Sequence, residues 1–216
     1  MRFGSLLLTC FVVACGGGRT QPVPAPLVHR FDDAARWSKE FDDPARDAWQ
    51  KPQAVVDAMG IAPGMTVADV GAGTGYFERR LSRAVGPSGV VLAVDIEPSM
   101  VDWLTKRAAR EGWTNVRALL ATVDDPKLPP GRVDRVLVVD TWHHIPNRVA
   151  YAAKLRAALA PGGTLTIVEF TRDAPRGPPA PHRVSPEALE SELRGAGFTT
   201  SRPAVELPYQ YVVTAR

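Results

Sequence analysis

Short apolar runs alternate with amphipathic segments along the chain from Phe31 onward. Apolar runs of this length, rich in Val, Leu and Ile and bounded by turn residues, predict strands that are buried on both faces of a parallel sheet. They fall at Thr66–Val70, Val90–Asp95, Val116–Leu120, 133–140 and 164–170. Strands that alternate with helical patterns indicate an α/β fold.

The segments between these runs predict helices. Residues 76–85 place Phe77, Leu81 and Val85 at helical spacing, with arginines on the opposite face. Further helices are expected over Pro98–Glu111, 149–159 and 186–196, the last with Ser185 as its N-cap. The final apolar segments, 198–207 and 209–214, predict an antiparallel hairpin.

Residues 31–59 also show a helical pattern, and their Trp37, Phe41, Trp49 and Val55 need an apolar surface to cover. Two arrangements satisfy this need. The segment can pack across the open end of the sheet as a lid or substrate wall, or it can cover one face of the sheet.

The first thirty residues have a different character. Arg2 is followed by an apolar run at 6–14, which at about a dozen residues is shorter than the roughly 20 that a membrane-spanning helix needs. A charged start, a short apolar centre and a small residue before the break are typical of a secretory signal peptide. Val12-Val13-Ala14-Cys15 resembles the bacterial lipoprotein processing box, in which cleavage precedes a lipidated cysteine.

The expected organisation is therefore a signal peptide at 1–14, a lipidated Cys15 with a flexible Gly/Pro tether over 15–30, and one domain over 31–216. That domain divides into a helical cap at 31–60 and a Rossmann-like core at 61–216. The protein is expected in the cell envelope, anchored by its N-terminal lipid to a membrane on the periplasmic face or the surface. A misassigned start codon or a buried apolar N-terminus is the alternative, and an unprocessed leader would leave the protein cytoplasmic.

Composition narrows the function. Apolar residues make up 45% and charged residues 23% of 216 residues, as in globular domains. Lys and Arg number 26 against 23 Asp and Glu, without a basic block, so no nucleic-acid partner is expected. Both cysteines, Cys10 and Cys15, precede the domain, which excludes a disulfide framework or a thiolate zinc site within it.

The first predicted strand runs through Asp69 into Gly71-Ala72-Gly73-Thr74-Gly75 and then into a helix. A glycine turn at a helix N-terminus presents backbone amides to a ligand. Tyr76 stands where the dinucleotide-binding pattern has a third glycine, so the turn suits a ligand without a pyrophosphate. S-adenosylmethionine fits, because its carboxylate suits the helix N-terminus and its ammonium suits carbonyls near Asp69. Asp95, at the end of the second strand, can accept both hydrogens of a ribose diol.

These residues resemble the class I S-adenosylmethionine-dependent methyltransferases over about residues 50–216. The segments that carry the resemblance are 67–75, 94–100 and Leu159-Ala160-Pro161-Gly162-Gly163. The resemblance implies a doubly wound, seven-stranded, mostly parallel sheet in the order 3-2-1-4-5-7-6, with S-adenosylmethionine as cofactor. Thr122 stands where the family usually has the acidic residue that meets the adenine, and Asp124 follows two positions later. The implied cofactor-binding residues are Asp69, Gly71, Ala72, Gly73, Gly75, Tyr76, Asp95, Ile96, Thr122, Val123, Asp124 and Asp140.

The fourth strand ends in Asp140-Thr141-Trp142-His143-His144, at the edge of the sheet where the methyl group would lie. Methyl transfer needs in-line positioning, and it needs a base when the nucleophile carries a proton. His143 or His144 can be that base, although one could instead bond a loop carbonyl and the other pack against the cofactor.

A second polar set, Glu169, His182 and Arg183, could contact the substrate. Trp49 could stack on the cationic sulfonium or anchor the N-terminal helix in the core. The spacing of the histidines does not support a metal site.

Two functions follow from the sequence. The first is a membrane-tethered methyltransferase that acts on a small-molecule acceptor. The second is a non-catalytic module that binds S-adenosylmethionine or S-adenosylhomocysteine, since export would separate the domain from the place where the cofactor is made. The presence of both Gly73 and Asp95 favours catalysis.

Overall fold

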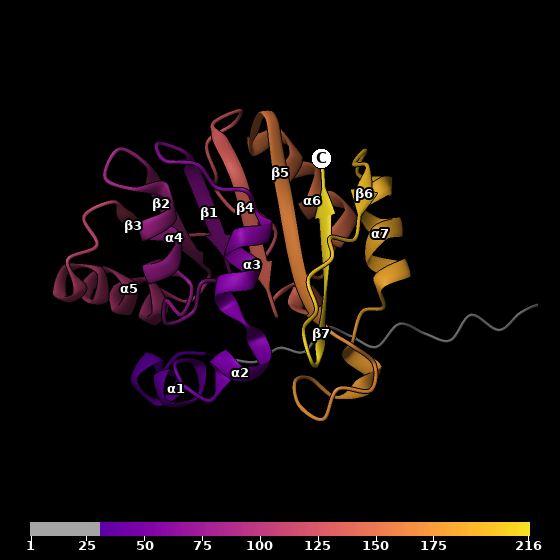
Figure 1. The fold of residues 1–216 in the computed structure, drawn as a ribbon, viewed down its shortest axis with the longest axis horizontal. Helices are drawn as coiled ribbons and strands as arrows, with labels where there is room; N and C mark the ends of the chain where they lie inside the picture. The colour runs from indigo at the N-terminus through magenta and orange to yellow at the C-terminus, as the bar shows by residue number, and fades with distance from the viewer. Residues whose placement is uncertain (1–30) are drawn as a thin grey trace, which may run out of the picture.

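The computed structural model describes residues 31–216, so the predicted signal peptide, Cys15 and the tether lie outside the described residues. The core is a seven-stranded sheet in the order β3-β2-β1-β4-β5-β7-β6 (Figure 1). This order confirms the predicted doubly wound α/β fold. The strands are β1 (Thr66–Val70), β2 (Val90–Asp95), β3 (Val116–Leu120), β4 (Val133–Val139), β5 (Leu159–Phe170), β6 (Thr200–Ser201) and β7 (Gln210–Ala215).

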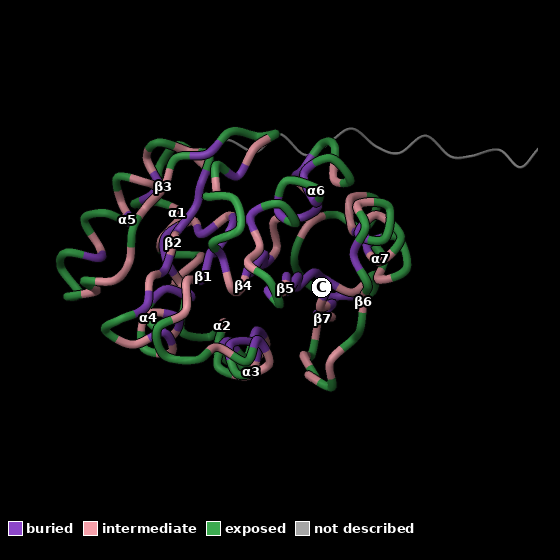
Figure 2. Tube along the Cα trace, turned by 90° about the horizontal axis from the view of Figure 1, so that it is seen from above, coloured by how far each residue is buried: buried purple, intermediate pink, exposed green. Residues whose placement is uncertain are grey.

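Neighbouring strands in the part β3-β2-β1-β4-β5 of the sheet are parallel, and β7 pairs antiparallel with both β5 and β6. Helices cover both faces of the sheet (Figure 2). They are α1 (Ala34–Phe41), α2 (Arg46–Gln50), α3 (Pro52–Ala58), α4 (Glu78–Val85), α5 (Pro98–Glu111), α6 (Arg148–Ala158) and α7 (Pro186–Gly195), with 3-10 turns at Trp142–His144 and Ala180–His182.

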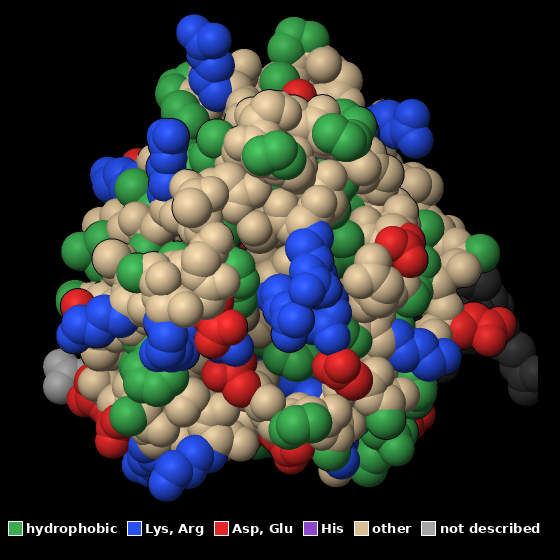
Figure 3. All heavy atoms as spheres, turned by 60° about the vertical axis from the view of Figure 1, so that its left-hand side comes forward, with side chains coloured by type: hydrophobic (Ala, Val, Ile, Leu, Met, Phe, Trp, Pro, Cys, Tyr) green, Lys and Arg blue, Asp and Glu red, His purple; other side chains and the backbone are tan. Residues whose placement is uncertain are grey.

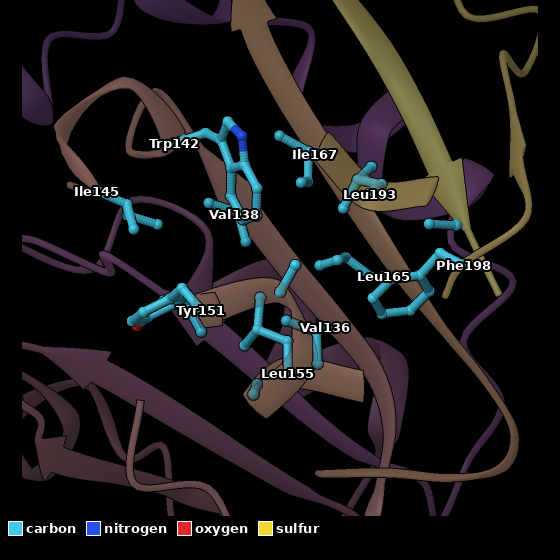
Figure 4. Close-up of a cluster of buried hydrophobic side chains, with 14 of the residues drawn as sticks. Val136, Val138, Trp142, Ile145, Tyr151, Leu155, Leu165, Ile167, Leu193 and Phe198 are labelled. Atoms are coloured by element: carbon cyan, nitrogen blue, oxygen red, sulfur yellow. The ribbon is translucent and has the colours of Figure 1, made fainter. Parts of the chain in front are cut away.

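Successive residues of β4 face opposite layers, as the period of a strand requires. Val136 and Val138 belong to the larger apolar core with α6 and α7, whereas Leu137 and Val139 pack with residues of α3 and α4. Figure 4 shows the larger core around Trp142, which is fully buried. The indole Nε1 of Trp142 donates a hydrogen bond to Glu192 of α7 at 2.9 Å. This bond fixes the ring in the apolar core between the sheet and the helices α6 and α7, close to the end of β4.

The predicted helical segment 31–59 is three helices, and each alternative arrangement describes part of it. α1 and α2 lie below the carboxyl ends of the parallel strands, at the lower edge of the sheet in Figure 1. α3 instead covers one face, where Val55 and Val56 are buried with residues of α4. The chain turns between α2 and α3 at Lys51, which has a left-handed φ of 43°.

The predicted C-terminal hairpin is wrong in its extent. Only Thr200–Ser201 of the segment 198–207 pairs with β7. Pro203 and Pro208 flank the rest of the segment, and proline cannot donate to a ladder of backbone hydrogen bonds. β5 begins earlier than predicted, at Leu159, which pairs with Val133 before the register shifts.

Within residues 31–216, no helix has the length and apolar character that crossing a membrane requires. Figure 3 shows one face of the molecule, on which basic and acidic side chains lie interspersed. This face has no continuous stripe of one charge.

Candidate active site

The turn after β1 has the backbone of a ligand cradle. Gly71, Gly73 and Gly75 have φ values of +81°, +58° and +94°, which side-chain-bearing residues rarely adopt. The amides of Gly71 and Ala72 donate to the Val94 carbonyl at 2.8 and 3.0 Å, which folds the turn over β2. A Cβ on Gly71 would lie 2.2 Å from Thr141 Oγ1, so the loop after β4 approaches the turn closely because glycine is there.

Asp95, at the end of β2, is held in a fixed orientation beside this turn. Its Oδ2 accepts a hydrogen bond from the Gly73 amide at 2.8 Å, and its Oδ1 accepts one from the Glu97 amide at 3.0 Å. Burial raises the pKa of Asp95, and these two amides lower it in part. A carboxylate fixed in this way retains lone pairs for the hydroxyls of a ribose.

The residues expected beside adenine lie at the neighbouring edge of the sheet. Ile96 and Val123 have 49% and 51% of their surface exposed, which is unusual for large apolar side chains and suits the covering of a flat base. Thr122 Oγ1 donates to Asp124 Oδ1 at 2.8 Å, and this bond lowers the pKa of Asp124. The adenine contacts of Thr122, Val123 and Asp124 stay predictions.

Two carboxyl groups lie beneath the glycine turn, although the sequence pointed to only one of them. Asp69 on β1 is 3% exposed and Glu78 at the start of α4 is fully buried. Burial raises the pKa of both groups, and the charge of Asp69 raises the pKa of Glu78 further. Glu78 shares helical spacing with Leu81 and Val85, so an acidic residue on an apolar helix face was the signal that could have revealed it.

The cap is fastened to the turn by two polar contacts. Arg107 of α5 donates to both oxygens of Asp42, at 2.8 and 2.9 Å, and to the Thr74 carbonyl at 2.7 Å. The hydroxyl of Tyr76 donates to Asp47 of α2. Tyr76 therefore joins the cap to the cradle, and α1 and α2 form a wall of the site.

A buried polar chain connects the cap to the end of β4. Arg46 lies over the ring of Tyr76, 4.2 Å from its centroid, and donates to Gln50 at 2.9 Å. Gln50 donates to Gln210 of β7, which donates to Asp140, both at 2.5 Å. Arg46 also lies 3.8 Å from the Asp140 carboxylate.

Asp140 has a left-handed φ of 52°, a strained conformation for a residue with a side chain. Burial raises its pKa to about 7, against the opposing effect of Arg46.

His143 and Glu169 form a buried hydrogen-bonded pair next to Asp140. His143 Nδ1 lies 3.0 and 2.9 Å from the two Glu169 oxygens, and the His143 amide also donates to Glu169 at 3.2 Å. Burial of the ring lowers the pKa of His143, but the carboxylates of Glu169 and Asp140 together raise it more, and the net shift is upward. The His144 ring lies 4.1 Å from that of His143 and 5.9 Å from Phe31.

The structure thus separates the second polar set of the sequence prediction. Glu169 joins His143, whereas Arg183 donates from all three of its guanidinium nitrogens to backbone carbonyls of the loop at 171–178. Arg183 therefore orders that loop rather than offering its charge to a substrate. His182 lies in the 3-10 turn that follows, where its amide donates to Pro179.

Trp49 packs against Phe170 and Tyr209, with ring centroids 5.6 and 6.3 Å away, as an anchor of α2 at the end of β5. Arg176, carried by the loop that Arg183 orders, lies 5.0 Å from the Trp49 ring. These aromatic rings and Arg176 form a cluster, called here the aromatic wall, at the end of β5. The sequence prediction included only Trp49 of this cluster. Among residues 31–216, no three His, Cys, Asp or Glu side chains are grouped as a metal site would require.

The residues present fit S-adenosylmethionine. A glycine turn with positive φ at Gly71, Gly73 and Gly75, a fixed carboxylate at the end of β2 and exposed apolar side chains beyond it match its three parts. Together with the strand order, they give this chain the fold and the glycine turn of the class I S-adenosylmethionine-dependent methyltransferases, to which it is similar. Residues 67–163 match the family model described as a methyltransferase domain.

Known proteins agree with this assignment. The ubiquinone/menaquinone biosynthesis C-methyltransferase UbiE of Bordetella avium is 36% identical over 118 residues, covering 53% of this chain and 44% of that protein. The UbiE of Hahella chejuensis is 28% identical over 118 residues, with 54% and 47% covered. The chain thus spans about half the length of these relatives. A solved methyltransferase from Aquifex aeolicus is similar over 85% of this chain and 97% of its own, with 29% identity and a TM-score of 0.79.

Proposed function

We propose that this protein transfers a methyl group from S-adenosylmethionine to a small-molecule acceptor whose nucleophilic atom carries a proton. The observation that carries the proposal is the buried pair of His143 and Glu169, which lies at the carboxyl edge of the sheet on the same side as the glycine turn. A histidine oriented by a buried carboxylate is the arrangement of a general base.

Each member of the pair has a defined part. Glu169 accepts the hydrogen of Nδ1, which leaves the lone pair of the neutral ring on Nε2. His143 Nε2 takes the proton of the acceptor while the acceptor forms its bond to the methyl carbon, and Glu169 stabilises the imidazolium that results. When bound, the cofactor would supply an electrophilic methyl group on a sulfonium, whose sulfur–methyl bond breaks as the new bond forms and leaves a neutral thioether.

The aromatic wall supports a flat acceptor. Trp49 and Tyr209 are partly exposed and pack with the buried Phe170, which follows Glu169 in β5, and Arg176 adds a positive charge over the rings of Trp49 and Tyr209. The UbiE relatives bear names from quinone biosynthesis, which makes hydroxylated aromatic compounds the first acceptors to test. A phenol-type hydroxyl or an activated ring carbon would need the base that His143 provides.

The proposal includes a lipid tether at Cys15. It is supported by the apolar run at 6–14, the small residues before Cys15 and the Gly/Pro stretch that follows. Such a tether would place the site within about a spacer length of a membrane that contains apolar acceptors. Metabolic labelling with an alkyne fatty acid, compared between the full chain and Cys15→Ser, tests this part, and equal labelling would contradict it.

The activity is tested with the full chain and methyl-labelled S-adenosylmethionine against quinols, phenols, thiols and amines. Label should pass to a hydroxylated aromatic acceptor, and His143→Ala should lower the rate far more than the neighbouring His144→Ala. Binding of the cofactor without transfer to any acceptor would favour the non-catalytic module instead.

A further inference from the structure

Glu78 is a buried acid that the proposed chemistry does not use. Its side chain is fully buried at the start of α4, where its side-chain hydrogen-bond partner is the carboxyl group of Asp69. The oxygen Oε2 lies 3.3 Å from the position that a Cβ on Gly75 would occupy. The carboxyl group therefore points at the underside of the glycine turn. A buried carboxyl whose partner is a second acid is costly, so its position at the glycine turn points to a role there.

The basic side chains nearest to Glu78 are engaged elsewhere. Arg107 of α5 donates to Asp42 and to the Thr74 carbonyl. Arg46 of α2 donates to Gln50 and to the Phe41 carbonyl and lies near Asp140. Within the described part of the chain, no basic side chain comes within ion-pairing distance of Asp69 or Glu78. The other charged group that faces Asp69 is the Asp95 carboxylate of β2, which adds negative charge.

Two neighbouring carboxyl groups without a cation cannot both ionise cheaply in a buried site, so such a pair retains a proton. The upward shift of the pKa of both groups agrees with this geometry.

We propose that Glu78, together with Asp69, forms the subsite for the ammonium of the cofactor's methionyl group, and that the pair releases a proton when that ammonium binds. This inference rests on the proposed use of S-adenosylmethionine. The proton leaves to solvent, and no other bond changes. Before binding, the shared proton limits the cost of burying two acids; after binding, the ligand's positive charge takes over that role.

The test is titration calorimetry of the full chain with S-adenosylmethionine near pH 7, in two buffers of different ionisation enthalpy. The difference in heat between the buffers gives the number of protons released. The matched variants are Glu78→Gln, which keeps the shape but cannot ionise, and Glu111→Gln at the exposed end of α5. A proton that the free ligand itself gains or loses is common to all of these proteins and cancels.

We expect the wild type and Glu111→Gln to release the same number of protons, and Glu78→Gln to release fewer, by up to about one. Glu78→Gln should also bind at least about tenfold more weakly, because a charged partner of the ammonium is gone. If Glu78→Gln does not fold, as judged by circular dichroism, Asp69→Asn replaces it with the same expectation. Equal proton release by wild type and variant would overturn the inference and leave the proposed function intact. Failure of the folded wild type to bind would overturn both.

Discussion

Gly71→Ala probes the closest backbone approach in the site. The substitution adds one methyl group at a residue whose φ is +81°, and that methyl would lie 2.2 Å from Thr141 Oγ1 and 2.5 Å from Thr141 Cγ2. The left-handed conformation costs about 1–2 kcal/mol for a residue with a Cβ, and overpacking adds about 1–3 kcal/mol. Gly71→Ala should therefore lower the free energy of unfolding by about 2–5 kcal/mol.

Gly112→Ala is the matched control, because Gly112 has a similar φ of +71° but nothing within 4 Å of its Cβ position. It should cost only the conformational part, about 1–2 kcal/mol. Urea unfolding followed by circular dichroism measures both values. Adding Thr141→Ala to Gly71→Ala removes the two nearest atoms and should recover about 1 kcal/mol or more relative to additivity. If Gly71→Ala cost no more than Gly112→Ala, the close approach of the β4 loop to the turn would be refuted.

Three further predictions follow from the site. His143→Gln should lower kcat by about 10²–10⁴ and remove the rise in rate with pH that deprotonation of the imidazole produces, while the Kd for the cofactor stays unchanged. A Kd that rises in proportion would contradict a role for His143 as the base. Asp140 has a folded pKa of about 7, above its unfolded value of 3.8, so its ionisation destabilises the fold as pH rises between these values. The free energy of unfolding of Asp140→Asn should therefore rise by about 2–4 kcal/mol relative to that of wild type between pH 4 and pH 8. A difference between the two proteins that does not change with pH would contradict this prediction. Arg107→Met removes the hydrogen bonds to Asp42 and Thr74, so hydrogen exchange of the backbone amides in residues 34–50 should become about tenfold faster or more. Unchanged exchange rates would show that Arg107 does not hold the cap to the glycine turn.

Much of the core could be predicted from the sequence, because each strand is a run of adjacent apolar residues. The run Val90–Asp95 is apolar until the aspartate that ends it, and the structure gives the same bounds. The glycine spacing after Asp69 likewise predicted the cradle, because positive φ and close approach are properties of glycine itself. Both features depend on residues that are adjacent in the chain.

The remaining parts of the site depend on contacts between distant segments. Gln50 and Gln210 are separated by 160 positions, and nothing in either local pattern predicts their hydrogen bond. His143 was a candidate base in the sequence, but its carboxylate partner Glu169 comes from the next strand, β5. The register in which β5 pairs with β4 determines that Glu169 lies beside His143. Arg183 was a candidate substrate contact, because nothing in the sequence shows that backbone carbonyls will bind all three of its guanidinium nitrogens.

The binding of S-adenosylmethionine at the glycine turn and Asp95 is most directly tested by calorimetric titration of the folded full chain with this cofactor, in parallel with Asp95→Ala. We expect one saturable site on the wild type. The affinity of Asp95→Ala should be at least about tenfold lower, because the carboxylate that meets the ribose is lost. Absence of binding by the wild type, or equal affinity in the two proteins, would contradict this expectation.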